Sequence, residues 1–457
     1  MSARMTRTIR IRKGLDIPVA GEPEQVIYPG PKVRHVALCG VDYFGLRPRL
    51  LVDAGDAVGL GQPLLEDKRD KAVCYGSPGR GTVVAINRGA RRVVESIVVR
   101  LENSGGKDVS FDALTERQIE GLDRDKAAER LLRSGLWTAF RTRPFSRVPP
   151  SDSTPRAIFV TAIDTRPLAP DPAVVVAREA AEFTLGLKVL TRLTSGTVWL
   201  CTAPDWQIPL PGIDPVRHVA FSGPHPAGLP GTHMHFLDPV GPDRTAWHIG
   251  YQDVTACGRL FQQGLIDTAR VVSLCGVCVN QPRLVTTRLG ASLEQMLADG
   301  VCKTEVSRVI SGSVLGGRAA TVPLAFLGRY HDQVSVFPEG GRVWPFGWLG
   351  LFPKRFTAAP IFARRTGHRR KFQFSTTQNG RFSGMLPMRV FDRLMPLDIL
   401  PSPLFRALLV KDTERAQALG CLELDEEDVA LCSFVCPAKH DYGIALRINL
   451  DLIEKEG

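Results

Sequence analysis

The chain has 457 residues, of which 44% are hydrophobic and 23% are charged, so it can bury the cores of about two to four domains. Basic residues outnumber acidic ones, which gives a net charge of +11 and a pI near 9.3. These residues are spread along the chain, and no helix-turn-helix, RNP or finger signature accompanies them, so nucleic acid is not expected as a partner. The charge suits an anionic membrane face or acidic partner subunits.

The ten cysteines are expected to be reduced thiols rather than a disulfide framework. The N-terminus is polar and basic and lacks the apolar core of a signal peptide. No stretch approaches the roughly 20 apolar residues that a membrane-spanning helix needs. We therefore expect a cytosolic chain without a membrane span. Met1 and Met5 are both candidates for the true start.

Residues 1–105 are predicted to form an all-β domain. Strand-like runs at 33–38, 82–86 and 96–101 are separated by Gly and Pro. The chain then presents, in order, Gly-Asp-Ala-Val at 55–58, Gly-Gln-Pro-Leu at 61–64 and Ser-Pro-Gly-Arg-Gly-Thr-Val at 77–83. This order resembles the biotinyl/lipoyl barrel-sandwich domain, whose short strands are joined by tight glycine turns.

Lys71 falls where a lipoyl domain presents its modified lysine. One interpretation is therefore a soluble lipoyl-type carrier or transferase with a swinging arm on Lys71. The other is a solvated lysine on a hairpin of a degenerate domain. The second is favoured, because the Met-Lys-Met sequence of biotinyl domains is absent and the flanking residues are not lipoyl-like.

Residues 110–257 alternate between helix-like and strand-like patterns, which predicts an α/β layer with a partly parallel sheet. Helix-like runs occupy 126–133 and 172–187, and strand-like runs occupy 157–162 and 197–202. Neither a Walker A motif nor a G-x-G-x-x-G fingerprint after a strand is present. A dinucleotide site of the usual kind is therefore not expected.

The last two hundred residues divide into three segments. Residues 258–330 suggest a small α+β module, with a strand at 270–274 and a helix at 292–297. Residues 331–384 are aromatic, Gly-rich and basic, and we expect irregular hairpins and connecting chain there. Residues 385–457 carry helix signals and an acidic run from Glu423 to Asp428. The predicted fold class is thus multidomain α/β and α+β.

A damaged iron–sulfur pattern lies near the end of the chain. A bacterial-ferredoxin run supplies four thiolates to a cubane cluster, but here only Cys432 and Cys436, before Pro437, keep the spacing, with Cys421 upstream. These three thiols are one ligand fewer than a cubane cluster needs. The cysteines are therefore interpreted as the buried remnant of a cluster fold, and a fourth ligand from a partner is the alternative. No metal is expected in this chain.

Motifs along nearly the whole chain are similar to those of the NqrA family, the A subunits of sodium-translocating NADH:quinone reductases. They lie at 11–21, 86–92, 134–145, 222–239, 249–253, 308–313, 328–335 and 420–436. Each motif is weak by itself, whereas eight in this order are specific. The family in turn resembles the C subunits of Rnf complexes and the NADH-binding subunit of complex I.

The resemblance implies a fold and a role. The implied parts are a barrel-sandwich (lipoyl-like) hybrid domain, a Rossmann-like domain, a β-grasp domain of the soluble-ligand-binding (SLBB) type at 258–330, and a helical C-terminal domain at 385–457 that looks like a ferredoxin module without a cluster. The implied role is that of a peripheral subunit on the cytoplasmic face of the bacterial inner membrane. Its complex is a translocase that oxidises NADH, reduces ubiquinone and exports Na⁺. FAD, FMN and iron–sulfur clusters are expected in the five other subunits, and this chain is expected to be non-catalytic.

Trp137, Phe140, Arg141, Arg143 and Phe145 gather aromatic rings and guanidinium groups around one proline. Trp and Arg dominate interface hot spots, so an anchor for partner subunits is the favoured interpretation. A quinone ring stacked on Trp137 or Phe140, with an arginine at a carbonyl, is the alternative that the family suggests.

His233 and His235, two residues apart in a Pro- and Gly-rich stretch, would lie on one face of a strand. A segment braced by side-chain hydrogen bonds is favoured over a metal site, and a hydrogen bond to a quinone carbonyl is a third interpretation. Cys275 and Cys278 form a CxxC without a second pair, so we expect an ordinary strand-to-turn pair rather than a zinc site.

Overall fold

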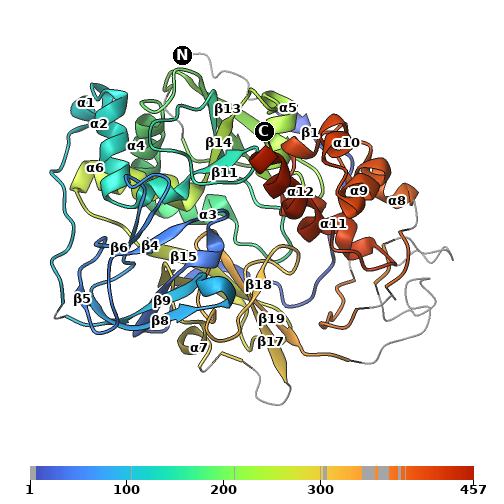
Figure 1. Ribbon diagram of the computed structural model, residues 1–457, viewed down its shortest axis with the longest axis horizontal. Coiled ribbons are helices and arrows are strands. Elements are labelled where there is room, and N and C mark those ends of the chain that lie inside the picture. Colours follow the sequence, from blue (N-terminus) through green and yellow to red (C-terminus); the bar gives the residue numbers. More distant parts are fainter. Residues whose placement is uncertain are drawn as a thin grey trace.

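The protein is described by a computed structural model, shown in Figure 1. The described residues are 7–103, 105–209, 212–298, 300–301, 306–341, 356–358, 370–378, 382–385 and 388–456. They form three β-sheet units and a group of C-terminal helices, which stand out in red in Figure 1 beside the green α/β sheet.

A six-stranded sheet in the order β1-β13-β12-β11-β14-β10 forms the α/β unit. Its strands are β1 (Arg7–Arg10), β10 (Arg141–Arg143), β11 (Ala157–Ala162), β12 (Thr197–Thr202), β13 (Val216–Ser222) and β14 (Ala246–Gly250). All neighbours are parallel except β10 and β14. The sequence thus predicted β11 and β12 with the correct bounds.

Helices cover both faces of this sheet, because successive residues of the central strand β11 point to opposite faces and nearly all of them are apolar. Ile158 and Val160 face the core shared with α4 (Ala180–Leu190) and α6 (Tyr251–Gln263), whereas Phe159 faces α5 (Pro230–Leu237). The remaining helices are α1 (Glu116–Glu120), α2 (Arg124–Arg133) and α3 (Pro172–Val176). The helix predicted at 172–187 is broken at Glu179, whose φ of −142° is not helical.

The boundary expected between residues 257 and 258 is wrong. It falls inside α6, which packs along α4 and against β11 and β14. Leu260 and Phe261, in the second half of this helix, belong to the same core as the sheet. The α/β unit therefore extends to the end of α6.

Two small antiparallel sheets form the barrel-sandwich unit and confirm the all-β prediction. One is β3-β9-β8-β5 and the other is β4-β6-β7. Their strands are β3 (His35–Cys39), β4 (Pro48–Leu50), β5 (Ala57–Val58), β6 (Pro63–Asp67), β7 (Cys74–Gly76), β8 (Gly81–Arg88) and β9 (Val94–Leu101). Lys71 is exposed in the turn between β6 and β7, a position compatible with both interpretations of this residue.

The third unit is a six-stranded mixed sheet in the order β18-β17-β19-β15-β16-β2. Its elements are β2 (Glu24–Pro29), β15 (Ala269–Cys275), β16 (Arg283–Arg288), β17 (Ser307–Ser311), β18 (Arg318–Ala319), β19 (Gln333–Pro338) and the helix α7 (Leu293–Met296). The irregular segment expected at 331–384 is therefore wrong at its start, since β19 is an interior strand. Residues 342–355 and 359–369 of that segment lie outside the described residues.

The first residues of the chain do not belong to the barrel-sandwich unit, contrary to the expected 1–105 domain. β1 extends the α/β sheet beside β13, and β2 extends the third sheet beside β16. Between them, Ile17 and Val19 are buried in the core of the C-terminal helices. Residues 7–29 thus join three units.

The C-terminal helices surround a core of their own, as predicted. They are α8 (Arg389–Leu394), α9 (Pro401–Val410), α10 (Thr413–Ala418), α11 (Glu426–Val435) and α12 (Tyr442–Glu456). The rings of Phe405 and Tyr442 stack in this core at a centroid distance of 4.0 Å. In the part of the chain that the structure describes, no helix has the length and apolar character required to traverse a bilayer.

Candidate functional site at the junction with the C-terminal helices

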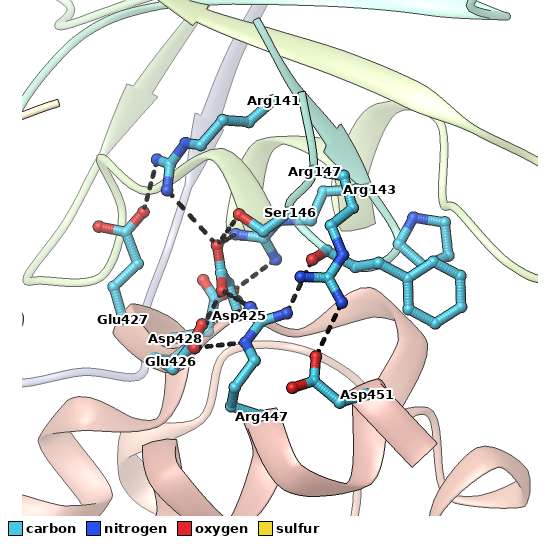
Figure 2. Close-up of polar contacts among 12 residues, drawn as sticks. Arg141, Arg143, Ser146, Arg147, Asp425, Glu426, Glu427, Asp428, Arg447 and Asp451 are labelled. Carbon is cyan, nitrogen blue, oxygen red and sulfur yellow. Dashed lines mark hydrogen bonds and ion pairs between the residues drawn. The ribbon is translucent and has the colours of Figure 1, made fainter. Parts of the chain in front are cut away.

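The edge strand β10 and the turn after it project toward the start of α11, as Figure 2 shows. The turn is closed by hydrogen bonds from Thr142 N to Arg147 O and from Ser146 N to Thr142 O. Phe145 and Ser146 adopt positive φ angles within it. This local fold directs Arg141, Arg143 and Ser146 at the acidic run of the C-terminal helices, and Arg147 at α12.

Arg143 is the most deeply buried member of this cluster, with a side chain that is 0% exposed. Its Nη1 donates to Asp428 Oδ2 at 2.8 Å and to the Glu423 carbonyl at 3.0 Å, and its Nη2 lies 3.4 Å from Asp425 Oδ2. A buried guanidinium requires such partners, because an isolated buried charge is strongly destabilising.

The acidic run is a helix start as well as a charge partner. Asp425 is the N-cap of α11, and Asp428 accepts a hydrogen bond from its backbone N–H, which completes a capping box. Burial raises the pKa of Asp428 to about 6, although Arg143 opposes the shift. Burial also acts against ionisation of Asp425, but Arg143 and Arg447 hold its pKa well below the ordinary value.

Arg447 of α12 completes the cluster from the other side. It donates to Glu426 at 2.6 Å, to Asp425 Oδ1 at 3.0 Å and to the Phe145 carbonyl at 2.7 Å. Arg147 reaches Asp451 of α12 at 2.8 Å, and Ser146 donates to Asp425 Oδ2 at 2.8 Å. These contacts lock α11 and α12 onto the α/β unit.

Arg141, unlike Arg143 and Arg447, is held by an aromatic ring and by longer ion pairs. Its guanidinium lies 4.7 Å from the ring centroid of Tyr330, and its nearest carboxylates are Glu427 at 3.6 Å and Asp425 at 3.7 Å. These distances exceed that of a hydrogen bond. Its N–H groups make no hydrogen bond to any residue that the structure describes.

The predicted aromatic residues of this segment are not surface anchors in this structure. Trp137 and Phe140 are fully buried and contact Trp247 edge-on or tilted, and Trp137 Nε1 donates to the Pro149 carbonyl at 2.8 Å. Neither ring presents a face at the surface. Phe145 is half-buried and packs against the core of the C-terminal helices.

The strand predicted for His233 and His235 is wrong, because both lie on α5, where residues two apart point in different directions. His233 is buried beside Phe221 and its Nε2 lies 3.0 Å from the Ala227 carbonyl. His235 Nδ1 lies 2.8 Å from Glu423, and its Nε2 accepts a hydrogen bond from Asp398 N at 3.0 Å. His235 therefore braces the same junction.

Cys421, Cys432 and Cys436 are buried in the core of the C-terminal helices. Burial raises the pKa of Cys421 to about 12 and that of Cys432 also well above the usual range. Over the residues described, no three His, Cys, Asp or Glu side chains converge as metal ligands would. Cys275 is also buried, and its thiol lies 3.5 Å from the Val334 carbonyl.

Tyr330, Asp332 and Arg447 were not predicted as site residues. The segment from Gly328 to Ser335 is where the units meet: Arg329 pairs with Asp253 of α6, and Tyr330 donates to the Thr138 carbonyl. In the sequence, the only signal for this segment was its match to the family motif at 328–335. The spacing of Asp425 and Asp428 did carry a signal, since it is that of a capping box.

Family models match three regions of the chain. They describe the NqrA N-terminal barrel-sandwich hybrid domain at residues 9–102, the NqrA second alpha/beta domain at 122–266 and the NQRA C-terminal domain at 271–322. The second match ends just beyond α6, in agreement with the corrected boundary.

Relatives that match from end to end are named as A subunits of the Na(+)-translocating NADH-quinone reductase. The relative from Rhodopirellula baltica is 50% identical over 449 residues, 98% of each chain. That from Saccharophagus degradans is 52% identical over 450 residues, 98% of this chain and 100% of its own, and that from Serratia proteamaculans is 50% identical over 452 residues, again 98% and 100%. This chain therefore belongs to the family of Na(+)-translocating NADH-quinone reductase A subunits.

Proposed function

We propose that this chain is a peripheral subunit of a sodium-translocating NADH:ubiquinone reductase, at the cytoplasmic face of the bacterial inner membrane. The observation that carries the proposal is the similarity, over 98% of the chain at about half identity, to relatives named as A subunits of such a reductase. The chain acts as a scaffold, and the flavins and iron–sulfur clusters belong to its five partner subunits.

The junction supports a scaffolding role. Arg143, Arg147 and Arg447 tie the last helices to the α/β unit through hydrogen bonds of 2.7–2.8 Å to Asp428, Asp451 and the Phe145 carbonyl. Residues 7–29 tie both to the third sheet. A chain whose units are joined by such contacts can hold its partner subunits in a fixed geometry. Its net charge of +11 suits acidic partners or anionic lipid.

The test is reconstitution. Membranes that contain the partner subunits but lack this chain should show little NADH-driven quinone reduction, and adding the purified chain should restore it. An affinity tag on this chain should recover the membrane subunits. Full activity and complete assembly without the chain would contradict the proposal.

A second function, quinone binding, is favoured by one cavity. A space of about 600 Å³ lies between the third sheet and the C-terminal helices, lined by Phe337, Phe356, Phe374 and Phe434. Phe356 and Phe434 are near parallel, at a centroid distance of 6.3 Å. Aromatic walls suit a planar quinone ring, and His440 and Lys439, which also line the cavity, can donate to its carbonyls.

Titration of the full chain with a short-chain ubiquinone, followed by calorimetry, tests this second function. Phe434→Asp should abolish saturable binding, because a carboxylate in the cavity is incompatible with an apolar ring. Phe236→Asp, at a half-exposed position of α5, is the matched control. Equal binding by both variants would exclude this cavity as the quinone site.

A further inference from the structure

The α/β sheet reverses its strand order at β11. Strands β12 and β13 lie on one side of β11, and β14 lies on the other. In parallel sheets such a reversal leaves a crevice at the carboxyl ends of the two strands, where ligands bind. Here those ends are Thr161 and Gly250, which are register partners, and α6 starts directly afterwards at Tyr251.

A cavity of about 70 Å³ occupies this position, and Thr161, His248 and Tyr251 line it. Within the described part of the chain, Thr161 Oγ1, His248 Nε2 and the Tyr251 hydroxyl, which lies near the Gln252 side chain, are buried polar atoms without a hydrogen-bond partner. The His248 and Tyr251 residues are only 4% and 3% exposed. Buried polar groups are normally paired, so three unpaired ones around a single cavity indicate a polar ligand.

The surrounding donors favour a negatively charged ligand. The N-cap of α6 is Gly250, which has no side chain to satisfy the first N–H groups of this 13-residue helix. Arg141 lines the same cavity, and its ion pairs with Glu427 at 3.6 Å and Asp425 at 3.7 Å leave its N–H groups without a hydrogen bond to the described residues. The helix start and the guanidinium both carry positive potential.

The carboxylates in the cavity wall are already engaged. Asp164 accepts two hydrogen bonds from Arg166, Asp253 pairs with Arg270 and Arg329, and Asp332 accepts one from Gln252. Glu427, the fourth carboxylate of the wall, forms ion pairs with Arg141 at 3.6 Å and with Arg166 at 3.9 Å. The four carboxylates therefore face four arginines of the same wall, Arg141, Arg166, Arg270 and Arg329. The groups without a hydrogen bond to the described residues, on Arg141, Thr161, His248 and Tyr251, can all donate one.

A larger hollow adjoins the cavity. Arg141, Arg166, Tyr330 and Glu427 line both the small cavity and a space of about 410 Å³ between the four units. The two spaces therefore share a wall. A molecule with a charged end in the small cavity has room for its remainder in the hollow, against Tyr330 and Phe44.

We propose that this cavity binds the anionic end of a small molecule, a carboxylate or a phosphate group. Arg141, the Thr161 and Tyr251 hydroxyls and the first N–H groups of α6 donate to it. His248 donates as well in the tautomer that carries its proton on Nε2. The site is distinct from the aromatic cavity proposed for quinone, and neither depends on the other.

Calorimetric titration of the full chain with inorganic phosphate, and separately with malonate, in a chloride buffer tests the proposal. Saturable binding of at least one anion is expected. Thr161→Val and Arg141→Gln should each raise its Kd by about tenfold or more, the loss expected for one hydrogen bond to a charged group. If only one of the two anions binds, the result identifies the ligand's anionic end as a phosphate or as a carboxylate.

Two control measurements accompany this titration. Thr161→Val removes an unpaired hydroxyl at constant shape, so the melting temperature without ligand should stay the same or rise. Arg156→Gln removes an equal charge just before the opposite end of β11 and should leave the Kd unchanged. Absence of binding by both anions, or binding that Thr161→Val and Arg141→Gln do not weaken, would overturn the proposal.

Discussion

Arg143 and Asp428 meet at 2.8 Å with side chains that are 0% and 1% exposed, although 285 residues separate them in the chain. The contact joins the edge of the α/β sheet to the start of α11. Asp425 lies beside both residues, so one guanidinium serves two buried carboxylates.

Replacing Arg143 should be far more damaging than replacing Asp428. Arg143→Met leaves Asp428 buried without its cation, whereas Asp425 keeps Arg447, and removing one partner of a buried pair typically costs about 3–5 kcal/mol. Asp428→Asn leaves Arg143 paired with Asp425 and removes a carboxylate whose ionisation burial opposes, so it should cost less than about 1 kcal/mol at pH 7 or even stabilise. Urea denaturation measures both free energies of unfolding.

The control for this pair is Arg156→Met, which removes the half-exposed ion pair with Asp238. Surface pairs contribute about 0–1 kcal/mol. Comparable losses in Arg143→Met and Arg156→Met would show that the buried junction does not stabilise the fold.

Stability should depend on pH through Asp428. Its pKa is raised from 3.8 to about 6, so the folded chain keeps a proton that the unfolded chain releases between these values. The contribution of this group to stability is therefore complete below pH 3.8 and is lost as the pH rises to 6, by on the order of 3 kcal/mol in all. The difference in melting temperature between wild type and Asp428→Asn should grow in favour of the variant across this range. A constant difference would rule out the shifted pKa.

Gly231 of α5 should tolerate no side chain. A Cβ at this position would lie 2.5 Å from both carboxylate oxygens of Asp428. Gly231→Ala should therefore displace Asp428 and destabilise the junction by about 1–3 kcal/mol, despite the better helix propensity of Ala. Gly241→Ala, which meets no atom within 4 Å, should be nearly neutral in the same thermal unfolding experiment.

Thiol labelling should distinguish the buried cysteines of the C-terminal helices from the half-exposed Cys74. Cys421, Cys432 and Cys436 are buried, whereas Cys74 is half-exposed, so native iodoacetamide treatment should modify Cys74 first. The three C-terminal thiols should react only after unfolding. Peptide mapping by mass spectrometry resolves each site, including Cys302, which lies outside the described residues. Rapid native labelling of Cys432 or Cys436 would contradict their burial.

The sequence predicted elements whose determinants are local. The strands at 157–162 and 197–202 are short apolar runs, and the structure places them in the middle of a sheet covered on both faces. The C-terminal helices likewise carry their own caps and core. Such elements can be predicted without knowledge of the rest of the chain.

Elements that depend on distant partners could not be predicted in this way. β1, β2 and β19 obtain their hydrogen bonds from strands in other parts of the chain. Their own residues do not indicate which strands these are. The acidic run from Glu423 to Asp428 was likewise visible in the sequence without its partners. Its actual partners, Arg143 and Arg447, became evident only when the tertiary structure brought them together.

The segment at 7–29 has a consequence for how the chain folds. It is translated before all of its partners, since β1 pairs with Val216–Ser222, β2 pairs with Arg283–Arg288, and Ile17 and Val19 enter a core made by the C-terminal helices. Contacts between residues so far apart form late. The segment can therefore complete its contacts only after the C-terminal helices have been made, and its full docking is a late step of folding.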